Sequence, residues 1–129
     1  MVKDMLLQIL DGNNLKEYRL ENFNKEYITF GRNSEQDIVL KNINVLRQHG
    51  YIKRIGNEWY IFDNKSTKGI WLNEKMISSS ILKNGDVVFL NREKSEATKF
   101  TIINDNMIPV IDRGQNNRSI NRYFRMITD

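Results

Sequence analysis

Three short polar turns in the middle of the chain carry residue types that could bind an anion. The first is Gly31-Arg32, the second is Arg47-Gln48-His49-Gly50, and the third is Ser66-Thr67-Lys68-Gly69. A guanidinium presents a planar fork of N–H donors and an ammonium presents a compact charge, so both bind phosphate or carboxylate oxygens. A hydroxyl adds a neutral donor. These residue types indicate an anion-binding site, provided that the fold brings the three turns together.

Each of the charged residues also has an ordinary surface explanation. Arg32 could form an ion pair with Asp37 or Glu35, which follow it closely in the sequence. Arg47 and Lys68 could be solvated charges on turns, as many exposed cations are. From the residues alone, an anion site and ordinary surface pairing both stand as interpretations.

The hydroxyl and imidazole groups also have two explanations. Thr67, or Ser66 beside it, could donate to a ligand or could cap the backbone of its own turn. His49 is the only histidine, and the chain contains no cysteine. The sequence shows no recognisable nucleophile–base pair and no metal-ligand spacing. We therefore expect no enzyme activity, no metal and no cofactor, and we expect His49 to be a partly buried structural residue.

The elements that must position these turns are short and rich in β-branched and aromatic residues. They alternate with turn signals such as Asp11-Gly12-Asn13-Asn14 and Lys83-Asn84-Gly85-Asp86. Gly56-Asn57 is predicted to form a tight hairpin turn. We count roughly ten strands, spaced about 8–12 residues apart, which predicts an all-β sandwich or barrel. The aromatic residues expected in its core are Trp59, Tyr60, Phe62 and Trp71.

The last part of the chain has a different pattern. Residues 106–129 contain an asparagine-rich linker with the only proline, Pro109, and then a candidate amphipathic helix that Ser119 could cap. The apolar positions of this helix fall at i, i+3, i+4 and i+7, namely at Ile120, Tyr123, Phe124 and Ile127. We therefore predict a β-sandwich over residues 1–105 and a linker with a short helix over residues 106–129.

Length and composition limit the class of protein. The 129 residues are enough for one domain with its own core, and the absence of cysteine fits a reducing compartment. No apolar run reaches the ~18 residues of a membrane span. The net charge of +4 is modest and the cations alternate with acids, so we expect no nucleic-acid surface. These observations predict a cytoplasmic domain whose sandwich does not contact a membrane.

Taken in order, the turns resemble the motifs of a forkhead-associated (FHA) domain. The resemblance covers roughly residues 3–105 and rests on the order and spacing of four segments. These segments are Gly31-Arg32, Arg47-Gln48-His49-Gly50, Ser66-Thr67-Lys68-Gly69 and Leu82-Lys83-Asn84-Gly85-Asp86. The resemblance implies a β-sandwich of about eleven strands whose loops at one end bind phosphothreonine peptides.

The resemblance also implies roles for individual residues. Arg32 matches the arginine that binds the phosphate, and Thr67 matches the threonine that touches the phosphothreonine. Arg47 matches the residue that follows the phosphate-binding serine of the family. The matches to structural positions are Gly31, His49, Gly69 and Asn73.

Two positions depart from the family pattern. Leu46 stands where the family has its phosphate-binding serine, and Lys68 stands where the family has the asparagine that holds the peptide backbone. Leucine has no donor, and lysine cannot accept a hydrogen bond. Arg47 could offset the missing hydroxyl, because a hydrogen bond to a charged group contributes about 1.5–3 kcal/mol. Lys68 could attract the phosphate or an acidic peptide as a mobile charge.

Two functions follow from this resemblance. The first is a phosphothreonine-peptide binding module that mediates protein–protein interaction through Arg32, Arg47 and Thr67, with Ser66 and Lys68 as further candidates. The alternative is a degenerate FHA domain that serves as a phosphate-independent assembly or scaffold module. The partner would be a phosphorylated or an unphosphorylated protein segment. We expect the chain to be the N-terminal module of a longer bacterial protein, such as the membrane ATPase of a type VII secretion system.

Overall fold

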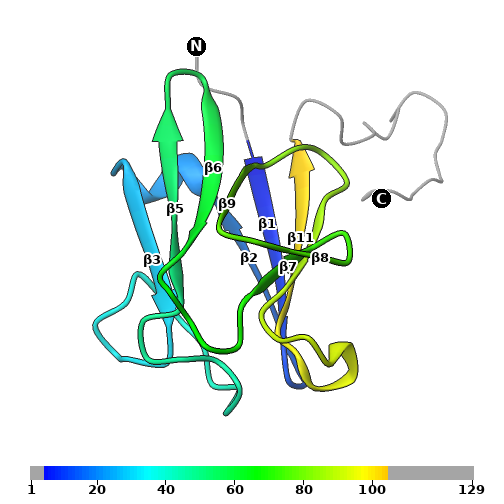
Figure 1. The fold of residues 1–129 in the computed structure, drawn as a ribbon. Coiled ribbons are helices and arrows are strands. Elements are labelled where there is room, and N and C mark those ends of the chain that lie inside the picture. The colour runs from blue at the N-terminus through cyan, green and yellow to red at the C-terminus, as the bar shows by residue number, and fades with distance from the viewer. Residues whose placement is uncertain (1–4, 105–129) are drawn as a thin grey trace, which may run out of the picture.

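The fold consists of two β-sheets packed face to face (Figure 1). A computed structural model of the chain describes residues 5–104, and these residues form eleven strands. One sheet has the strand order β2-β1-β11-β10-β7-β8 and the other has the order β4-β3-β5-β6-β9. The strands are β1 (Met5–Asp11), β2 (Asn14–Arg19), β3 (Tyr27–Gly31), β4 (Ile38–Val39), β5 (Gly50–Ile55), β6 (Glu58–Asp63), β7 (Ile70–Leu72), β8 (Lys75–Ile77), β9 (Ser79–Ile81), β10 (Val87–Phe89) and β11 (Lys99–Asn104). The predicted all-β sandwich is confirmed.

Little other regular structure is present in the described part of the chain. It contains two short 3-10 helices, η1 (Leu20–Phe23) and η2 (Lys94–Glu96). None of the helices in residues 5–104 has the length and apolar character needed to cross a bilayer. The predicted linker and helix over residues 106–129 lie outside the described residues.

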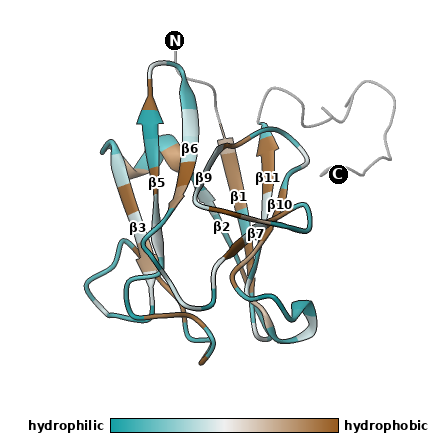
Figure 2. Ribbon diagram, viewed as in Figure 1, coloured by the Kyte–Doolittle hydropathy of each residue, from teal (hydrophilic) through white to brown (hydrophobic). Residues whose placement is uncertain are grey.

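The strands follow the period-two pattern that buries one face. In β1, Met5, Leu7 and Ile9 are buried while the residues between them are more exposed. The two sheets press such faces together to form one core, and the hydrophobic residues of the strands appear as brown segments of the ribbon in Figure 2. Its members are Met5, Leu7, Ile9, Leu20, Ile28, Phe30, Ile38, Leu40, Val45, Ile52, Trp59, Ile61, Ile70, Leu82, Val88, Leu90, Phe100 and Ile102.

The hairpin between β5 and β6 forms where the sequence predicts it. Strand β5 ends at Ile55 and β6 begins at Glu58, so Gly56 and Asn57 are the two turn residues. Gly56 has a positive φ of 62°, a backbone conformation that glycine adopts without steric cost. The hairpin aligns β5 against β6 from Ile55↔Glu58 back to Gly50↔Asp63. Its far end therefore places the residues after Asp63 beside the residues before Gly50.

The core prediction is wrong for three of the four aromatic residues. Trp59 is in the core and only 1% exposed, but Tyr60, Phe62 and Trp71 are half-buried. Tyr60 and Phe62 alternate with Trp59 and Ile61 along β6, so they lie on its outer face. There Phe62 stacks on the neighbouring ring of Tyr51, with centroids 4.9 Å apart.

Candidate functional site

The three polar turns lie at one end of the sandwich. They follow β3, precede β5 and follow β6, which are neighbours in the five-stranded sheet. In this sheet Gly50, the first residue of β5, is paired with Phe30 of β3 and with Asp63 of β6. The loops therefore meet at the lower end of the view in Figure 1. The fold brings together the three turns that the sequence analysis singled out.

His49 connects the second turn to the third. Its Nδ1 accepts a hydrogen bond from the backbone N–H of Leu46 at 3.1 Å, and its Nε2 lies 2.8 Å from the carbonyl oxygen of Gly69. Since Nδ1 must accept, the hydrogen is on Nε2, which donates to Gly69. The side chain is fully buried, and burial lowers the pKa of His49 below its ordinary value although Gly69 and Asp63 act in the opposite direction. The imidazole is therefore neutral at neutral pH.

The first turn touches the second through the backbone. The N–H of Arg32 donates to the carbonyl of Leu46 at 3.0 Å, and the N–H of Asn33 donates to that of Arg47 at 3.1 Å. A Cβ atom at Gly31 would lie 2.2 Å from the carbonyl oxygen of Arg47. Only a glycine fits beside that carbonyl, so the close approach of these two backbone segments requires a glycine before Arg32.

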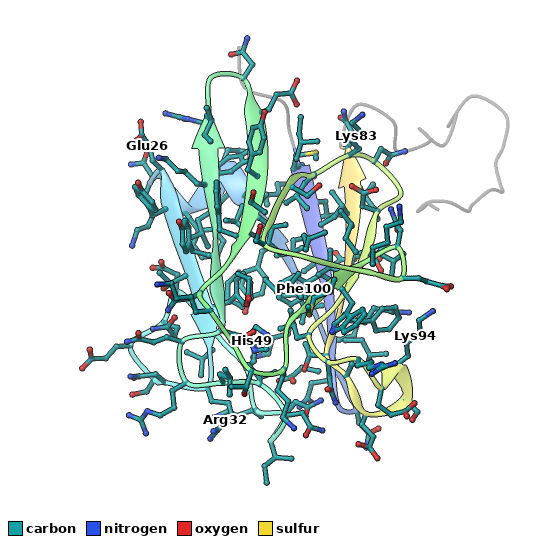
Figure 3. All side chains as sticks on the ribbon, in the orientation of Figure 1. Glu26, Arg32, His49, Lys83, Lys94 and Phe100 are labelled. Carbon is teal, nitrogen blue, oxygen red and sulfur yellow. The ribbon has the colours of Figure 1, made fainter. Side chains whose placement is uncertain are left out.

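Arg32 projects from this junction toward solvent. Its Nε donates to the carbonyl of Val45, and its side chain lies below His49 in Figure 3. Within residues 5–104, Arg32 forms no ion pair with Glu35 or Asp37. The contact to Val45 orients the guanidinium and leaves its terminal nitrogens available to an anion.

Asp37, one of the two acids that could have formed an ion pair with Arg32, contacts other residues instead. Its carboxylate forms an ion pair with Lys25 at 2.8 Å and accepts hydrogen bonds from the backbone and hydroxyl of Thr29. Burial alone would raise the pKa of Asp37, but the hydrogen bonds from Lys25 and Thr29 outweigh it and lower that pKa. Asp37 thus ties the first loop to β3 and does not neutralise the site.

The second turn presents one cation and one apolar residue. Arg47 is exposed, and its guanidinium has no hydrogen bond or ion pair to any residue that the structure describes. Leu46 is half-buried. Its backbone N–H donates to His49, and its carbonyl accepts from the N–H of Arg32. At the position where the family has a serine, this chain therefore offers backbone groups that are already paired and an alkyl side chain.

The third turn separates its two hydroxyls. Ser66 Oγ donates to Asp63 at 2.6 Å, accepts from the N–H of Gly69 at 2.9 Å and lies 3.2 Å from Nε2 of His49. Thr67 is exposed and forms no hydrogen bond to the described residues. Ser66 is therefore occupied inside the turn, while Thr67 remains available to a ligand.

Lys68 and the two remaining family positions differ in their surroundings. The carbonyl of Lys68 accepts from the indole of Trp71, while its ammonium is exposed and has no partner among residues 5–104. Gly69 takes a positive φ of 79°, which the sharp turn into β7 requires. Asn73 is not part of the site, because it forms the β7–β8 turn and bonds Asp86 at 3.2 Å.

One buried carboxylate that supports the second loop was not found by sequence reasoning. Asp11, which is only 4% exposed, accepts hydrogen bonds from the backbone N–H groups of Lys41 at 2.6 Å and Asn42 at 3.1 Å. It also accepts from the hydroxyl of Thr98 at 2.8 Å. Thr98 is 87 positions further along the chain, so no local pattern indicates the contact.

The described residues contain no cluster of three or more histidine, cysteine or carboxylate side chains that could hold a metal ion. The site contains three exposed cations without an ion pair among residues 5–104, Arg32, Arg47 and Lys68, and the unbonded hydroxyl of Thr67. Hydrogen bonds of His49 and Ser66 hold the loops that carry them. Such an arrangement suits the binding of an anion.

Comparison with known proteins identifies the class. Residues 28–91 match the family described as FHA domain. The eleven-stranded sandwich agrees with this match, and the chain therefore contains a forkhead-associated domain, a type of protein-interaction module.

Individual relatives are similar over part of their length. The chain is 33% identical over 78 residues to an oxoglutarate dehydrogenase inhibitor from Corynebacterium jeikeium, a match that covers 54% of each chain. It spans about half the length of the curated relatives it matches. The Slr1951 protein from Synechocystis sp. has a similar fold, with a TM-score of 0.68 and 23% identity over 80% of this chain and 97% of that one. EmbR from Mycobacterium tuberculosis, solved with a low-affinity phosphopeptide, has a TM-score of 0.60 and 26% identity over 76% of this chain and 24% of that one.

Proposed function

We propose that this domain binds phosphothreonine-containing segments of partner proteins through Arg32, Arg47 and Thr67. The observation that carries the proposal is the group of unpaired cations on loops that His49 and Ser66 hold in place. A bound phosphopeptide in the similar EmbR structure supports the same class of ligand.

The chemistry of each residue fits a phosphate. The terminal nitrogens of Arg32 can donate to two phosphate oxygens together, because Nε is already fixed on Val45. Arg47 adds a second charge, and Thr67 adds a hydroxyl without first breaking a bond within the protein. Lys68 supplies a mobile charge on the same turn. Arg47 in this scheme takes the place of the hydroxyl that Leu46 lacks.

A second candidate function is phosphate-independent assembly by the same domain. Leu46 favours it, since a half-buried alkyl group at the family's serine position donates no hydrogen bond to phosphate. Lys68 favours it too, because an ammonium does not replace both the donor and the acceptor of an asparagine. The two functions differ in whether affinity depends on the phosphoryl group.

The deciding experiment is calorimetric titration with a threonine peptide and its phosphorylated twin. We expect the domain to bind the phosphopeptide and not its unphosphorylated twin. We expect Arg32→Ala to weaken phosphopeptide binding at least about tenfold, since a charge-assisted hydrogen bond contributes about 1.5–3 kcal/mol. Lys16→Ala, on the exposed strand β2, is the control that removes one positive charge elsewhere. Equal affinity for both peptides, or full affinity of the Arg32 variant, would support the assembly function instead.

The substitution Leu46→Ser tests the site from the opposite direction. If Arg32, Arg47 and Thr67 surround a phosphate, a hydroxyl at position 46 adds a donor to it and should tighten phosphopeptide binding several-fold. An unchanged affinity in a variant with unchanged thermal stability would mean that residue 46 does not face the ligand.

We further propose that the domain acts in the cytoplasm as the N-terminal module of a longer bacterial protein, such as the membrane ATPase of a type VII secretion system. The partial coverage of its relatives is compatible with a longer parent. Immunoblotting of fractionated cells with an antibody against the domain tests this proposal. A band of about 15 kDa in the soluble fraction alone would contradict it.

A further inference from the structure

A row of large side chains crosses three strands on the outer face of the six-stranded sheet. Phe89 of β10 is in register with Trp71 of β7, and Trp71 is in register with Met76 of β8. Residues alternate between faces, so these three lie opposite the buried Val88 and Ile70. We call Phe89, Trp71 and Met76 the outer row.

The outer row is exposed at one end and accompanied by cations. Met76 is 64% exposed on β8, which is the edge strand of its sheet. The guanidinium of Arg92 lies 6.0 Å from the ring centre of Trp71, and the ammonium of Lys94 lies 5.5 Å from that of Phe89. Lys94, labelled at the right of Figure 3, also pairs with Glu74 at 3.0 Å. Arg92 has no ion pair within residues 5–104.

The outer row begins where the third turn of the candidate site ends. The indole N–H of Trp71 donates to the carbonyl of Lys68 at 3.1 Å. A Cβ atom at Gly69 would lie 3.1 Å from both the indole nitrogen of Trp71 and the sulfur of Met76. The surface therefore continues from Thr67 and Lys68 onto the row with no intervening element.

Cross-strand pairing alone does not account for this surface. Neighbouring side chains on a sheet stabilise one another, which is sufficient reason for Phe89 and Trp71 to be adjacent. It does not require a methionine that is mostly exposed at the sheet edge, nor an unpaired arginine over the indole. A flexible thioether and an arginine stacked on an aromatic ring are both common at protein-binding surfaces.

We propose that the outer row is a second contact surface for the phosphorylated partner. It binds the segment of that partner next to the phosphothreonine, and this segment contains acidic residues and one large apolar side chain. The charges of Lys68 and Arg92 select the acidic residues, and Met76 and Trp71 receive the apolar one. The inference rests on the proposed function, since the phosphothreonine brings this segment to the row. Strands are about 4.8 Å apart, so the three strands span about 10 Å, which about three extended residues cross.

The test uses synthetic peptides as probes. The first is a short phosphothreonine peptide flanked by alanine and serine. Two others add a tail of aspartates and one phenylalanine, on the N-terminal or the C-terminal side, and two more add a neutral tail of glutamine and serine. Affinities are measured by fluorescence anisotropy for the domain and for the double variant Met76→Glu with Arg92→Glu. Ile55→Glu with Lys16→Glu is the matched control, because it makes the same charge change at an exposed isoleucine and an exposed cation elsewhere.

We expect one of the acidic tails to tighten binding at least about tenfold over the short peptide. The gain should disappear in the Met76/Arg92 variant, persist in the control variant, and be absent with neutral tails. The affinity for the short peptide should be the same in all three proteins apart from a small general charge effect. Equal affinity for short and tailed peptides, or a gain that both variants lose equally, would overturn the proposal.

Nuclear magnetic resonance separates this inference from the proposed function. The acidic tail without phosphothreonine, added at millimolar concentration, should shift the indole signal of Trp71 and leave that of the buried Trp59 unchanged. A Trp71 shift together with no binding of the short phosphopeptide would contradict the proposed function and show that the outer row binds an acidic segment without phosphothreonine. An unshifted Trp71 signal would overturn the second surface, whatever the phosphopeptide does.

Discussion

The loop that carries Leu46 and Arg47 is held at its two ends by different chemistry. At its start, the carboxylate of Asp11 accepts two backbone hydrogen bonds and one from Thr98. At its end, the imidazole of His49 accepts one backbone hydrogen bond and donates another. Both side chains are buried, yet a carboxylate only accepts whereas an imidazole must hold one particular tautomer.

This difference separates two requirements of the site. Asp11 joins the loop to the other sheet, through Thr98 next to β11, and so fixes where the loop starts. His49 joins the loop to the third turn, so it fixes the positions of Arg47 and Thr67 relative to each other. Loss of the first contact should mainly lower stability, and loss of the second should lower both stability and ligand affinity.

The largest effect is expected from His49→Ala. The substitution removes a buried ring that stacks beside Phe30 and leaves the N–H of Leu46 without its acceptor. A cavity of that size and a lost buried hydrogen bond together cost about 3–5 kcal/mol of unfolding free energy. Urea unfolding measures the loss. At equal folded fraction, phosphopeptide affinity should also fall; an unchanged affinity would show that the second and third turns keep their places without the imidazole.

Asp11→Ala should rank second. It leaves the N–H groups of Lys41 and Asn42 and the hydroxyl of Thr98 without an acceptor, which costs about 2–3 kcal/mol. Asp11→Asn keeps one acceptor oxygen and should cost less. Urea unfolding of both variants, with phosphopeptide titration of the folded protein, checks this. If Asp11→Ala weakened binding more than His49→Ala at the same folded fraction, the assignment of the two ends would be reversed.

The pH dependence of stability tests the His49 end of the loop by itself. Burial lowers the pKa of His49 below 6.5, so between that pKa and 6.5 the unfolded state binds more protons than the folded state. The unfolding free energy should therefore fall as the pH decreases through this window, by up to about 1.4 kcal/mol per pH unit, and should not depend on His49 above it. Denaturant titrations from pH 5 to 8 measure the slope. The variant His49→Gln should lack it, and a slope retained in that variant would assign the proton to another group.

The parts of this molecule that the sequence predicts are those that depend on neighbours in the chain. Gly56-Asn57 forms the expected hairpin because turn chemistry is local. Tyr60 and Phe62 were expected in the core because they belong to an uninterrupted run of large apolar residues that resembles a buried strand, whereas strand alternation places them outside.

Contacts across the fold were beyond such reasoning. The motif order indicated that the turns converge, but not that Ser66 is occupied by Asp63 and Gly69 while Thr67 is free. The bond between Asp11 and Thr98 joins the end of one strand to the start of another across the whole sequence, and nothing in either neighbourhood encodes the partner. Site residues with bonded neighbours are thus separable from ligand-facing ones only once the fold is known.

The smallest and sharpest comparison pairs two hydroxyl deletions, Thr98→Val and Ser66→Ala. Thr98 is fully buried and donates one of the three hydrogen bonds to the buried carboxylate of Asp11, so its loss should cost about 1.5–2 kcal/mol, less than Asp11→Ala. Ser66 is half-buried, so water can replace its hydrogen bonds to Asp63 and Gly69, and its loss should cost about 0.5–1.5 kcal/mol. Thermal unfolding ranks the two variants. Phosphopeptide affinity should fall more in Ser66→Ala than in Thr98→Val, since Ser66 lies within the third turn and contacts His49. If Thr98→Val weakened phosphopeptide binding more than Ser66→Ala, the Asp11 end of the loop would control the geometry of the site as well as its stability.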